Sequence, residues 1–218
     1  MEVISINVGL PREVPWRGKT VSTAIFKSPV EGPVKLRTLN LDGDGQADLS
    51  VHGGPNKAAY AYPAEHYEFW RGELSDMDLM WGHFGENFTT RGLVEENVHI
   101  GDTFRVGSAL VKVTQPRLPC YKLGIRFGRA DMVKRFLASR RTGFYFAVLE
   151  EGTVQAGDSF TYVERSTHGI SVADIARLYA FDKDDWATMR RVVEVKALSK
   201  SWRGYFEQRL EKNDQSSA

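Results

Sequence analysis

Alternation of apolar and polar positions dominates the first three quarters of the chain. Runs in which every second residue is apolar or aromatic, bounded by Gly, Pro, Asn or Asp, are typical of half-buried β-strands. Such runs predict strands at residues 2–8, 21–27, 34–39, 58–62, 103–106, 109–114, 144–149 and 159–164. Many short strands with few helices favour a mainly β fold, either a barrel or a sandwich, and closure into a barrel would remove exposed strand edges.

Two of these strands are joined by a clear turn signal. Gly107 and Ser108 separate TFRV from ALVKVT, which predicts a hairpin whose two-residue turn begins with glycine. The tetrapeptide GDTF at 101–104 also recurs as GDSF at 157–160. Two copies are too few for a repeat protein, so we interpret them as equivalent Gly-Asp turns that open two strands of one sheet.

Helical spacing is sparse before residue 165. Pro63 precedes AEHYEFWRGEL, where Tyr67, Phe69 and Trp70 form an aromatic face, and this pattern predicts a helix. A second short helix is predicted at residues 130–139.

The pattern becomes helical after residue 166. Ser171 and Asp174 form a variant of the capping box at the start of SVADIARLYA. DDWATMRRVVEV and LSKSWRGYFEQRLEK then place apolar residues at helical spacing. The sequence therefore predicts a β-barrel domain over 1–165 and a small three-helix domain over 166–218. Three short helices bury little surface alone, so we expect them to dock on the barrel or on the second subunit of a homodimer.

Composition and charge are those of an ordinary globular protein. The chain has 218 residues, 42% hydrophobic and 26% charged, with a formal net charge of +1. Because the charge is balanced, it favours neither nucleic acid nor a membrane surface as a partner. No segment approaches the roughly 18 apolar residues of a transmembrane helix. A single cysteine, Cys120, allows no intrachain disulfide, which fits a reducing compartment, and we expect a cytoplasmic location.

The segment VTQPRLPCYKLGIRFGR, residues 113–129, holds this only thiol. Pro119 stiffens the backbone beside Cys120, and Arg117 and Lys122 lie close in sequence. Neighbouring cations lower the pKa of a thiol and favour the thiolate, which is a nucleophile and a soft metal ligand. The alternative is a cysteine that only fills space in the core. The prolines and cations favour a functional cysteine, because a packing cysteine needs neither.

A glycine-rich turn introduces the strand at 58–62. In VHGGPNKAAYAYP, Gly53 and Gly54 allow positive φ and a close approach of backbone N–H groups to an anion, and His52 and Lys57 flank them. The stretch is a candidate phosphate cradle, although an ordinary tight turn explains it equally well. A zinc site is not indicated, because the five histidines lack metal-ligand spacing.

Two further segments carry candidate polar contacts. In WGHFGENFTTRGL, Glu86 and Asn87 can face a cavity or can belong to an ordinary polar turn. Upstream, VKLRTLNLDGDGQAD contains Arg37 and Asp44 in a glycine-rich loop. That loop lacks the acidic ladder and terminal glutamate of an EF-hand, so we exclude a calcium site of that type.

Taken together, these segments resemble a known family. DGDGQADLSVHGGPNKAAYAYP, FGENFTTRGL, IGDTFRVG and TQPRLPCYKL occur in this order and are similar to motifs of MOSC domains, the C-terminal domains of molybdenum cofactor sulfurases. With the helical segment behind them, they most resemble the YiiM-type branch of that family. The resemblance covers nearly the whole chain, and four ordered motifs are a specific signal.

The resemblance implies a fold, a cofactor and an activity. The implied fold is a closed β-barrel of the pyruvate-kinase-barrel type with a few helices, followed by a three-α domain. The implied cofactor is the molybdenum cofactor, a pyranopterin phosphate whose dithiolene holds the metal, with Cys120 at the position of the family's metal-ligating cysteine. YiiM-type proteins are associated with the reduction of N-hydroxylated bases such as 6-hydroxylaminopurine, so the implied activity is that of a molybdenum-dependent oxidoreductase.

Each candidate residue can now be given an expected role. We expect Cys120 to be the metal ligand and a catalytic residue, and Asn87, Glu86 and Tyr60 to contact substrate or deliver protons. The cofactor phosphate needs cations and backbone donors. We expect these from His52, Gly53, Gly54, Lys57, Arg117, Lys122 and Arg37.

Electrons must reach such a site from outside the chain. No Gly-x-Gly-x-x-Gly opens a helix after a strand, so the sequence shows no dinucleotide fingerprint, and we expect an external donor, a flavoprotein. Three alternatives stay open. They are a carrier that holds the cofactor without turnover, a sulfur carrier with a persulfide on Cys120, and an interaction domain with an inert buried thiol.

Overall fold

The structure, a computed structural model, describes residues 1–47 and 53–216. The strands in these ranges are β1 (Glu2–Val8), β2 (Arg12–Trp16), β3 (Lys19–Thr23), β4 (Ser28–Val30), β5 (Val34–Leu36), β6 (Ala59–Pro63), β7 (Phe88–Arg91), β8 (Thr103–Val106), β9 (Ala109–Pro116), β10 (Phe144–Glu150), β11 (Gly152–Val154) and β12 (Phe160–Glu164). The helices are the short 3₁₀ helix η1 (Pro55–Lys57), α1 (Glu65–Glu73), α2 (Tyr121–Phe127), α3 (Met132–Ala138), α4 (Val172–Ala180), α5 (Trp186–Val193) and α6 (Lys200–Ser216). None of these helices combines the length and the apolar character that a bilayer crossing requires.

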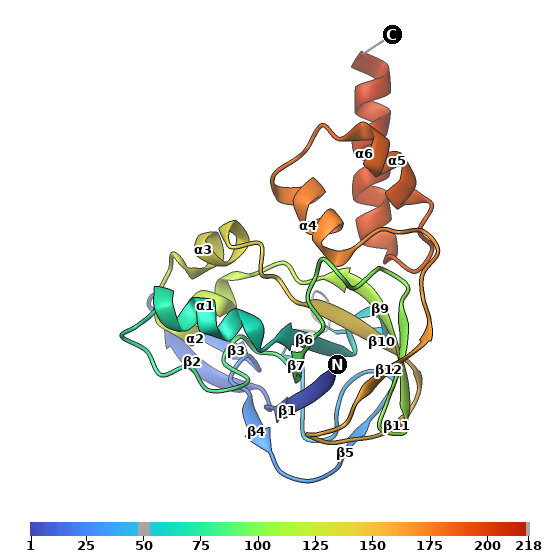
Figure 1. Cartoon of the computed structure of the whole chain (residues 1–218). Helices are drawn as coiled ribbons and strands as arrows, with labels where there is room; N and C mark the ends of the chain where they lie inside the picture. Colours follow the sequence, from blue (N-terminus) through green and yellow to red (C-terminus); the bar gives the residue numbers. More distant parts are fainter. Residues whose placement is uncertain (48–52, 217–218) are drawn as a thin grey trace.

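One large mixed sheet organises the chain (Figure 1). Its strand order is β12-β8-β9-β10-β6-β7-β1-β4, and neighbours run antiparallel except for β6 and β7. That pair is parallel because α1 and the loop behind it form the crossover that parallel neighbours require. The predicted hairpin between β8 and β9 is confirmed, with Val106 opposite Ala109 and Gly107 at a φ of 53°.

The sheet curls so that its β12 edge meets β1. The backbone N–H of Val3 donates to the carbonyl of Asp158 at 2.8 Å, and that of Phe160 donates to the carbonyl of Met1 at 3.0 Å. β12 is one end of the strand order, whereas β1 is second from the other end. A mixed, sheet-dominated fold with six α-helices is thus observed in the described ranges, and full closure into a barrel stays a prediction.

Phenylalanines fill the concave side of the curled sheet. Phe88, Phe104, Phe146 and Phe160 come from four strands and are at most 3% exposed. Neighbouring ring centroids among them lie 5.8 to 6.3 Å apart, mostly in edge-to-face contacts. Such contacts add to the apolar burial, so this cluster fixes the curvature of the sheet that carries the site.

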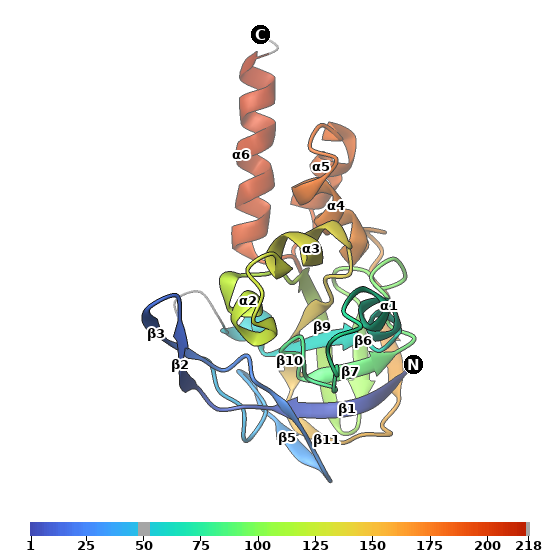
Figure 2. The same cartoon turned by 90° about the vertical axis from the view of Figure 1, so that its left-hand side faces the viewer.

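The three C-terminal helices dock on the sheet of their own chain (Figures 1 and 2). The N–H of Val172 donates to the carbonyl of Val98, and Ile100 donates to Ile170, both at 2.9 Å. Buried side chains of α4, α5 and α6 belong to the same hydrophobic cluster as the sheet. The 165/166 domain boundary stays a prediction, because this core is continuous across it.

The predicted start of α4 is confirmed. Asp174 N–H donates to Ser171 Oγ at 3.0 Å, and the Asp174 carboxylate accepts from Ser171 N–H at 3.0 Å. These reciprocal bonds complete a capping box and satisfy two N–H groups that the helix itself leaves unpaired.

A second hydrophobic cluster lies between β6 and helices α1, α2 and α3, and His83 packs at its edge. The His83 ring lies 4.8 Å from the Phe127 ring, and its Nδ1 is 3.3 Å from an Arg126 nitrogen. Burial, followed by the Arg126 charge, lowers the pKa of His83 to about 4. This histidine is therefore neutral in the folded protein at neutral pH.

We expect His83→Gln to make the fold less sensitive to acid. Histidine titrates at 6.5 in the unfolded chain and at about 4 in the folded one. The unfolded state therefore binds more protons between these values, and stability falls as the pH drops through this window. The variant lacks this contribution, so its Tm should fall less than the wild-type Tm between pH 7 and pH 4. Exposed His168→Gln is the control, and equal falls in all three proteins would contradict the assignment.

Candidate functional site

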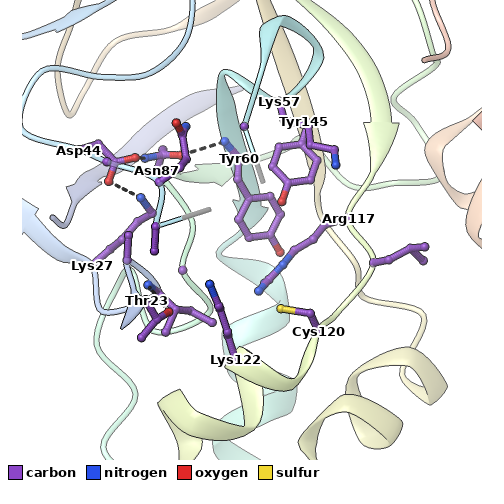
Figure 3. A pocket seen from close by; sticks show the side chains of 18 residues that line it. Thr23, Lys27, Asp44, Lys57, Tyr60, Asn87, Arg117, Cys120, Lys122 and Tyr145 are labelled. Atoms are coloured by element: carbon purple, nitrogen blue, oxygen red, sulfur yellow. Dashed lines mark hydrogen bonds and ion pairs between the residues drawn. The ribbon is translucent and has the colours of Figure 1, made fainter. Parts of the chain in front are cut away.

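Cys120 lines a hollow at one end of the sheet, together with Gly53, Lys57, Arg117 and Lys122 (Figure 3). Cys120 is half-buried and outside any disulfide, and its sulfur points into the hollow between the Arg117 and Lys122 side chains. The glycine turn before β6, the loop after β9 and the start of α2 thus meet here, although they are distant in sequence. This hollow is the candidate site.

Arg117 is the most deeply buried cation of the hollow. It is 6% exposed, donates to the carbonyl of Phe84 at 2.5 Å and lies over the Tyr60 ring at 4.7 Å. Burial acts against its charge, but interactions with Tyr60, Tyr145 and Cys120 prevail and raise the pKa of Arg117. A permanently charged guanidinium therefore stands beside the thiol.

Lys27 and Asp44 form a buried ion pair in the wall of the hollow (Figure 3). The same carboxylate accepts from Gly9 N–H at 2.9 Å and from Asn87 Nδ2 at 2.8 Å. Burial lowers the pKa of Lys27 and the Asp44 charge opposes this shift. The Asp44 carboxylate thus holds Lys27, Gly9 and Asn87 in position.

The described wall of the hollow is electropositive. It contains Lys27, Lys57, Arg117 and Lys122 against the single carboxylate of Asp44, a formal balance of four minus one, or +3. Lys57 is partly buried, which lowers its pKa. A concave surface with excess positive charge concentrates anions, which suits a phosphate-bearing ligand.

Gly53 and Gly54 adopt the conformation expected of the glycine turn. Their φ angles are 93° and 87°, in the region that favours glycine, and a Cβ on Gly53 would lie 2.9 Å from the Gln46 side chain. Gly53 lines the hollow, whereas Gly54 caps η1 and its carbonyl accepts from Lys57 N–H at 2.9 Å. His52 lies outside the described residues.

Asn87 and Tyr60 line the hollow, but their polar atoms already have partners. Asn87 Oδ1 accepts from Tyr60 N–H at 3.0 Å, and its Nδ2 donates to Asp44. The Tyr60 hydroxyl donates to the Thr142 carbonyl at 2.8 Å, and burial raises the Tyr60 pKa. Both residues build the wall.

Glu86 is not brought to the hollow. It is fully buried and its carboxylate accepts from Tyr67, from Gly82 N–H at 2.7 Å, from Phe84 N–H at 3.1 Å and from Thr89 at 2.9 Å. Burial raises the pKa of Glu86 against the effect of these bonds. Its place is inside the turn before β7, where it stabilises the loop.

Arg37 also lies apart from the hollow. It is exposed and forms a bidentate ion pair with Asp42, in which Nε donates to Oδ1 at 2.6 Å and Nη2 donates to Oδ2 at 2.9 Å. It is not among the described residues that line the hollow. The geometry of the hollow therefore gives no support to the cofactor contact expected of Arg37.

Sequence reasoning did not single out Lys27 and Tyr145, which line the hollow. Lys27 directly follows the apolar residues AIF, which is a weak signal, because a charge carried into the core by such a run needs a buried partner. Tyr145 alternates with inward-facing phenylalanines on β10 and gave no signal. Burial raises the Tyr145 pKa.

Comparison with known proteins identifies the family of the chain. The MOSC domain family model matches residues 48–161, more than half of the chain. The chain belongs to the MOSC domain family. A second model, of the YiiM-like 3-alpha helix domain, matches residues 170–213. MOSC domains in general are associated with binding of the molybdenum cofactor.

Similar proteins extend over most of this MOSC chain. It is 46% identical over 204 residues to the uncharacterized protein YflK of Bacillus subtilis, covering 94% of this chain and 92% of the relative. It is similar to the crystal structure of YiiM from Geobacillus stearothermophilus, with a TM-score of 0.80, 36% identity and coverage of 96% and 98%. A protein of Gibberella moniliformis named reductase is 35% identical over 164 residues, covering 74% of this chain and 29% of that protein.

Proposed function

We propose that this MOSC protein binds the molybdenum cofactor in the Cys120 hollow and reduces N-hydroxylated bases. The observation that carries the proposal is the single thiol, half-buried and directed into a hollow with a formal charge of +3 from four cations and one carboxylate. The relative from Gibberella moniliformis is named reductase, and this name supports a reductive activity. The resemblance of the sequence motifs supports the class of substrate.

The donor set of the hollow fits this cofactor. A pyranopterin carries a phosphate, and Lys57, Lys122 and Arg117 supply cations that can bind it. Gly53 brings backbone to the same surface without a side chain. Cys120 supplies one soft sulfur ligand, and the pterin dithiolene would supply two more. One cysteine is therefore sufficient.

The chemistry is a two-electron reduction. A base R–NHOH takes up two electrons and two protons and gives R–NH₂ and water, so 6-hydroxylaminopurine becomes adenine. When bound, the molybdenum cofactor supplies the two electrons of this reaction. An external electron-donor protein, a flavoprotein, must supply them in turn.

The protein residues bind, orient and hold protons. Arg117 stays charged, so it can attract an anionic ligand to the side of the hollow where the Cys120 sulfur lies. Burial keeps the Tyr145 hydroxyl protonated, and this group faces the hollow, where it can donate a hydrogen bond to a leaving hydroxyl. Tyr60 and Asn87 hold the wall in place through their own hydrogen bonds.

The test is metal analysis combined with an assay. Protein purified from a host that makes the cofactor should contain molybdenum and should convert 6-hydroxylaminopurine to adenine when a chemical reductant is added. Bound cofactor without turnover would instead favour the carrier. A stable mass increase of one sulfur on Cys120, after incubation with a cysteine desulfurase, would favour the sulfur carrier.

We further expect Lys57→Gln to weaken cofactor binding. Its amine is one of the cations of the hollow, and loss of a charge-assisted hydrogen bond corresponds to about 1.5–3 kcal/mol, or roughly 10- to 100-fold in affinity. The measurement is the molybdenum content retained after dialysis. Lys35→Gln, an exposed lysine of β5, is the matched control and should retain the wild-type content. Equal retention by both variants would argue against a phosphate contact at Lys57.

A further inference from the structure

A second hollow adjoins the first where the sheet meets the C-terminal helices. We call it the aromatic groove, lined on one side by Tyr179 of α4 and by Trp202 and Tyr205 of α6. Cys120 and Lys57 line both hollows, as do Leu118 and Tyr145. The groove therefore opens directly onto the thiol.

The wall formed by the helices is a packed aromatic surface. The Tyr179 ring centroid lies 5.2 Å from that of Trp202 and 5.2 Å from that of Tyr205. Trp202 is 6% exposed and is held by the core, whereas Tyr179 and Tyr205 are half-buried. Rigid rings lose little conformational entropy on binding, so they suit a flat aromatic ligand.

Gln115 on the opposite wall has an unsatisfied polar atom. It lies on β9 opposite Tyr145 of β10 and is only 4% exposed. Its Oε1 has no hydrogen-bond partner among the described residues. A buried acceptor without a hydrogen-bond partner destabilises the fold, so its presence needs a structural or functional reason. An amide both donates and accepts, which matches the hydrogen-bonding edge of a heterocyclic base.

Charge separates the two hollows. The aromatic groove contains one charged residue in the described part, Lys57, whereas the first hollow contains four cations and one carboxylate. The groove thus favours a neutral planar ligand, and the first hollow favours an anion. A cofactor phosphate and a purine ring would thus favour different ends of a continuous surface, with Lys57 and Cys120 at the boundary between them.

We propose that the aromatic groove binds the base of the substrate. The ring of an N-hydroxylated heterocycle stacks on Tyr205 and meets the tilted Tyr179 ring with its edge. A polar edge of the base pairs with the Gln115 amide, and its N–OH group is directed toward Cys120. The three-helix segment therefore supplies the specificity for aromatic substrates. This inference rests on the proposed function for the identity of the substrate.

The test measures binding and turnover separately on the cofactor-loaded protein. Calorimetry with 6-hydroxylaminopurine gives Kd, and the assay gives kcat/KM for this base and for N-hydroxyurea, which has no ring. We expect Gln115→Leu to weaken Kd about tenfold, as for one hydrogen bond. We expect Tyr205→Ala to weaken it at least about fivefold, as for one stacked base. In both variants kcat/KM should fall more for the base than for N-hydroxyurea.

Two controls make the result interpretable. Tyr162→Ala removes a half-buried tyrosine of β12 away from the groove and should bind the base like wild type. Gln115→Leu should unfold at the same or a higher temperature than wild type, since it removes an unpartnered acceptor. Wild-type affinity in both groove variants would overturn the inference, even if the base is reduced. Weakened binding with no wild-type turnover would retain the groove assignment and reject the proposed reductase.

Discussion

Cys120→Ser should lose its molybdenum while the fold stays intact. The substitution replaces a soft thiolate with a hydroxyl that is a poor ligand for a dithiolene-bound metal. Loss of groups that merely orient metal ligands already weakens metal binding about 10- to 100-fold, so the affinity for the metal should fall by at least about tenfold and the metal content should fall with it. The readout is elemental analysis of protein purified from a host that makes the cofactor, with the reductase assay beside it.

The position of Cys120 indicates that this substitution should leave the stability of the fold unchanged. Cys120 is half-buried at the mouth of the hollow and is not a member of either hydrophobic cluster. The thermal midpoint should therefore stay close to that of wild type. Thr23→Ser, which also changes a side chain of the hollow, should keep the wild-type metal content. A folded Cys120→Ser protein with unchanged molybdenum would refute the ligand role.

Much of the sheet could be predicted from local pattern. The strand at 2–8 is reproduced residue for residue as β1, although both of its faces are buried from Ser5 to Asn7. β7 was missed because Phe88, Thr89 and Thr90 are all buried, so the strand has no polar alternation to reveal it. In the structure the buried Thr89 hydroxyl donates to the Glu86 carboxylate, so this polar group has a partner inside the fold.

The helix directly after Cys120 was also missed. Its sequence YKLGIRF is short and has a glycine in the middle, which disfavours a helix by local propensity. Tertiary packing requires that glycine, since a Cβ on Gly124 would lie 2.8 Å from the Arg129 carbonyl. Contacts of this kind cannot be read from a single sequence.

For the candidate site, too, some residues could be placed from the sequence and others could not. Arg117, Cys120 and Lys122 could be placed together because they are neighbours in sequence, and the structure keeps them in one hollow. For Glu86 the sequence allowed a side chain that faces a cavity or an ordinary polar turn, and the structure shows donors of its own turn bound to its carboxylate. A sequence shows that a carboxylate is present in a glycine turn, and it does not show which side of the turn that group faces.

The second large effect is expected for Asp44→Asn. The change leaves the buried Lys27 without its anionic partner, and removal of one member of a buried pair typically destabilises by about 3–5 kcal/mol. It also weakens the acceptor for Gly9 and Asn87, which position the wall of the hollow. Urea denaturation at pH 7 should show the loss, whereas Asp42→Asn, in the exposed pair with Arg37, should change little.

The pH dependence of Asp44→Asn distinguishes a buried lysine charge from loss of packing. Burial already lowers the pKa of Lys27, and the variant removes the Asp44 charge that opposes this shift. The unfolded lysine titrates at about 10.4. Between the lowered pKa of Lys27 in the folded variant and that value the unfolded state binds more protons, so the stability of the variant rises as the pH rises. The deficit should therefore shrink between pH 7 and pH 10. Adding Lys27→Met should recover most of it at pH 7, and a deficit independent of both pH and Lys27 would locate the effect in packing instead.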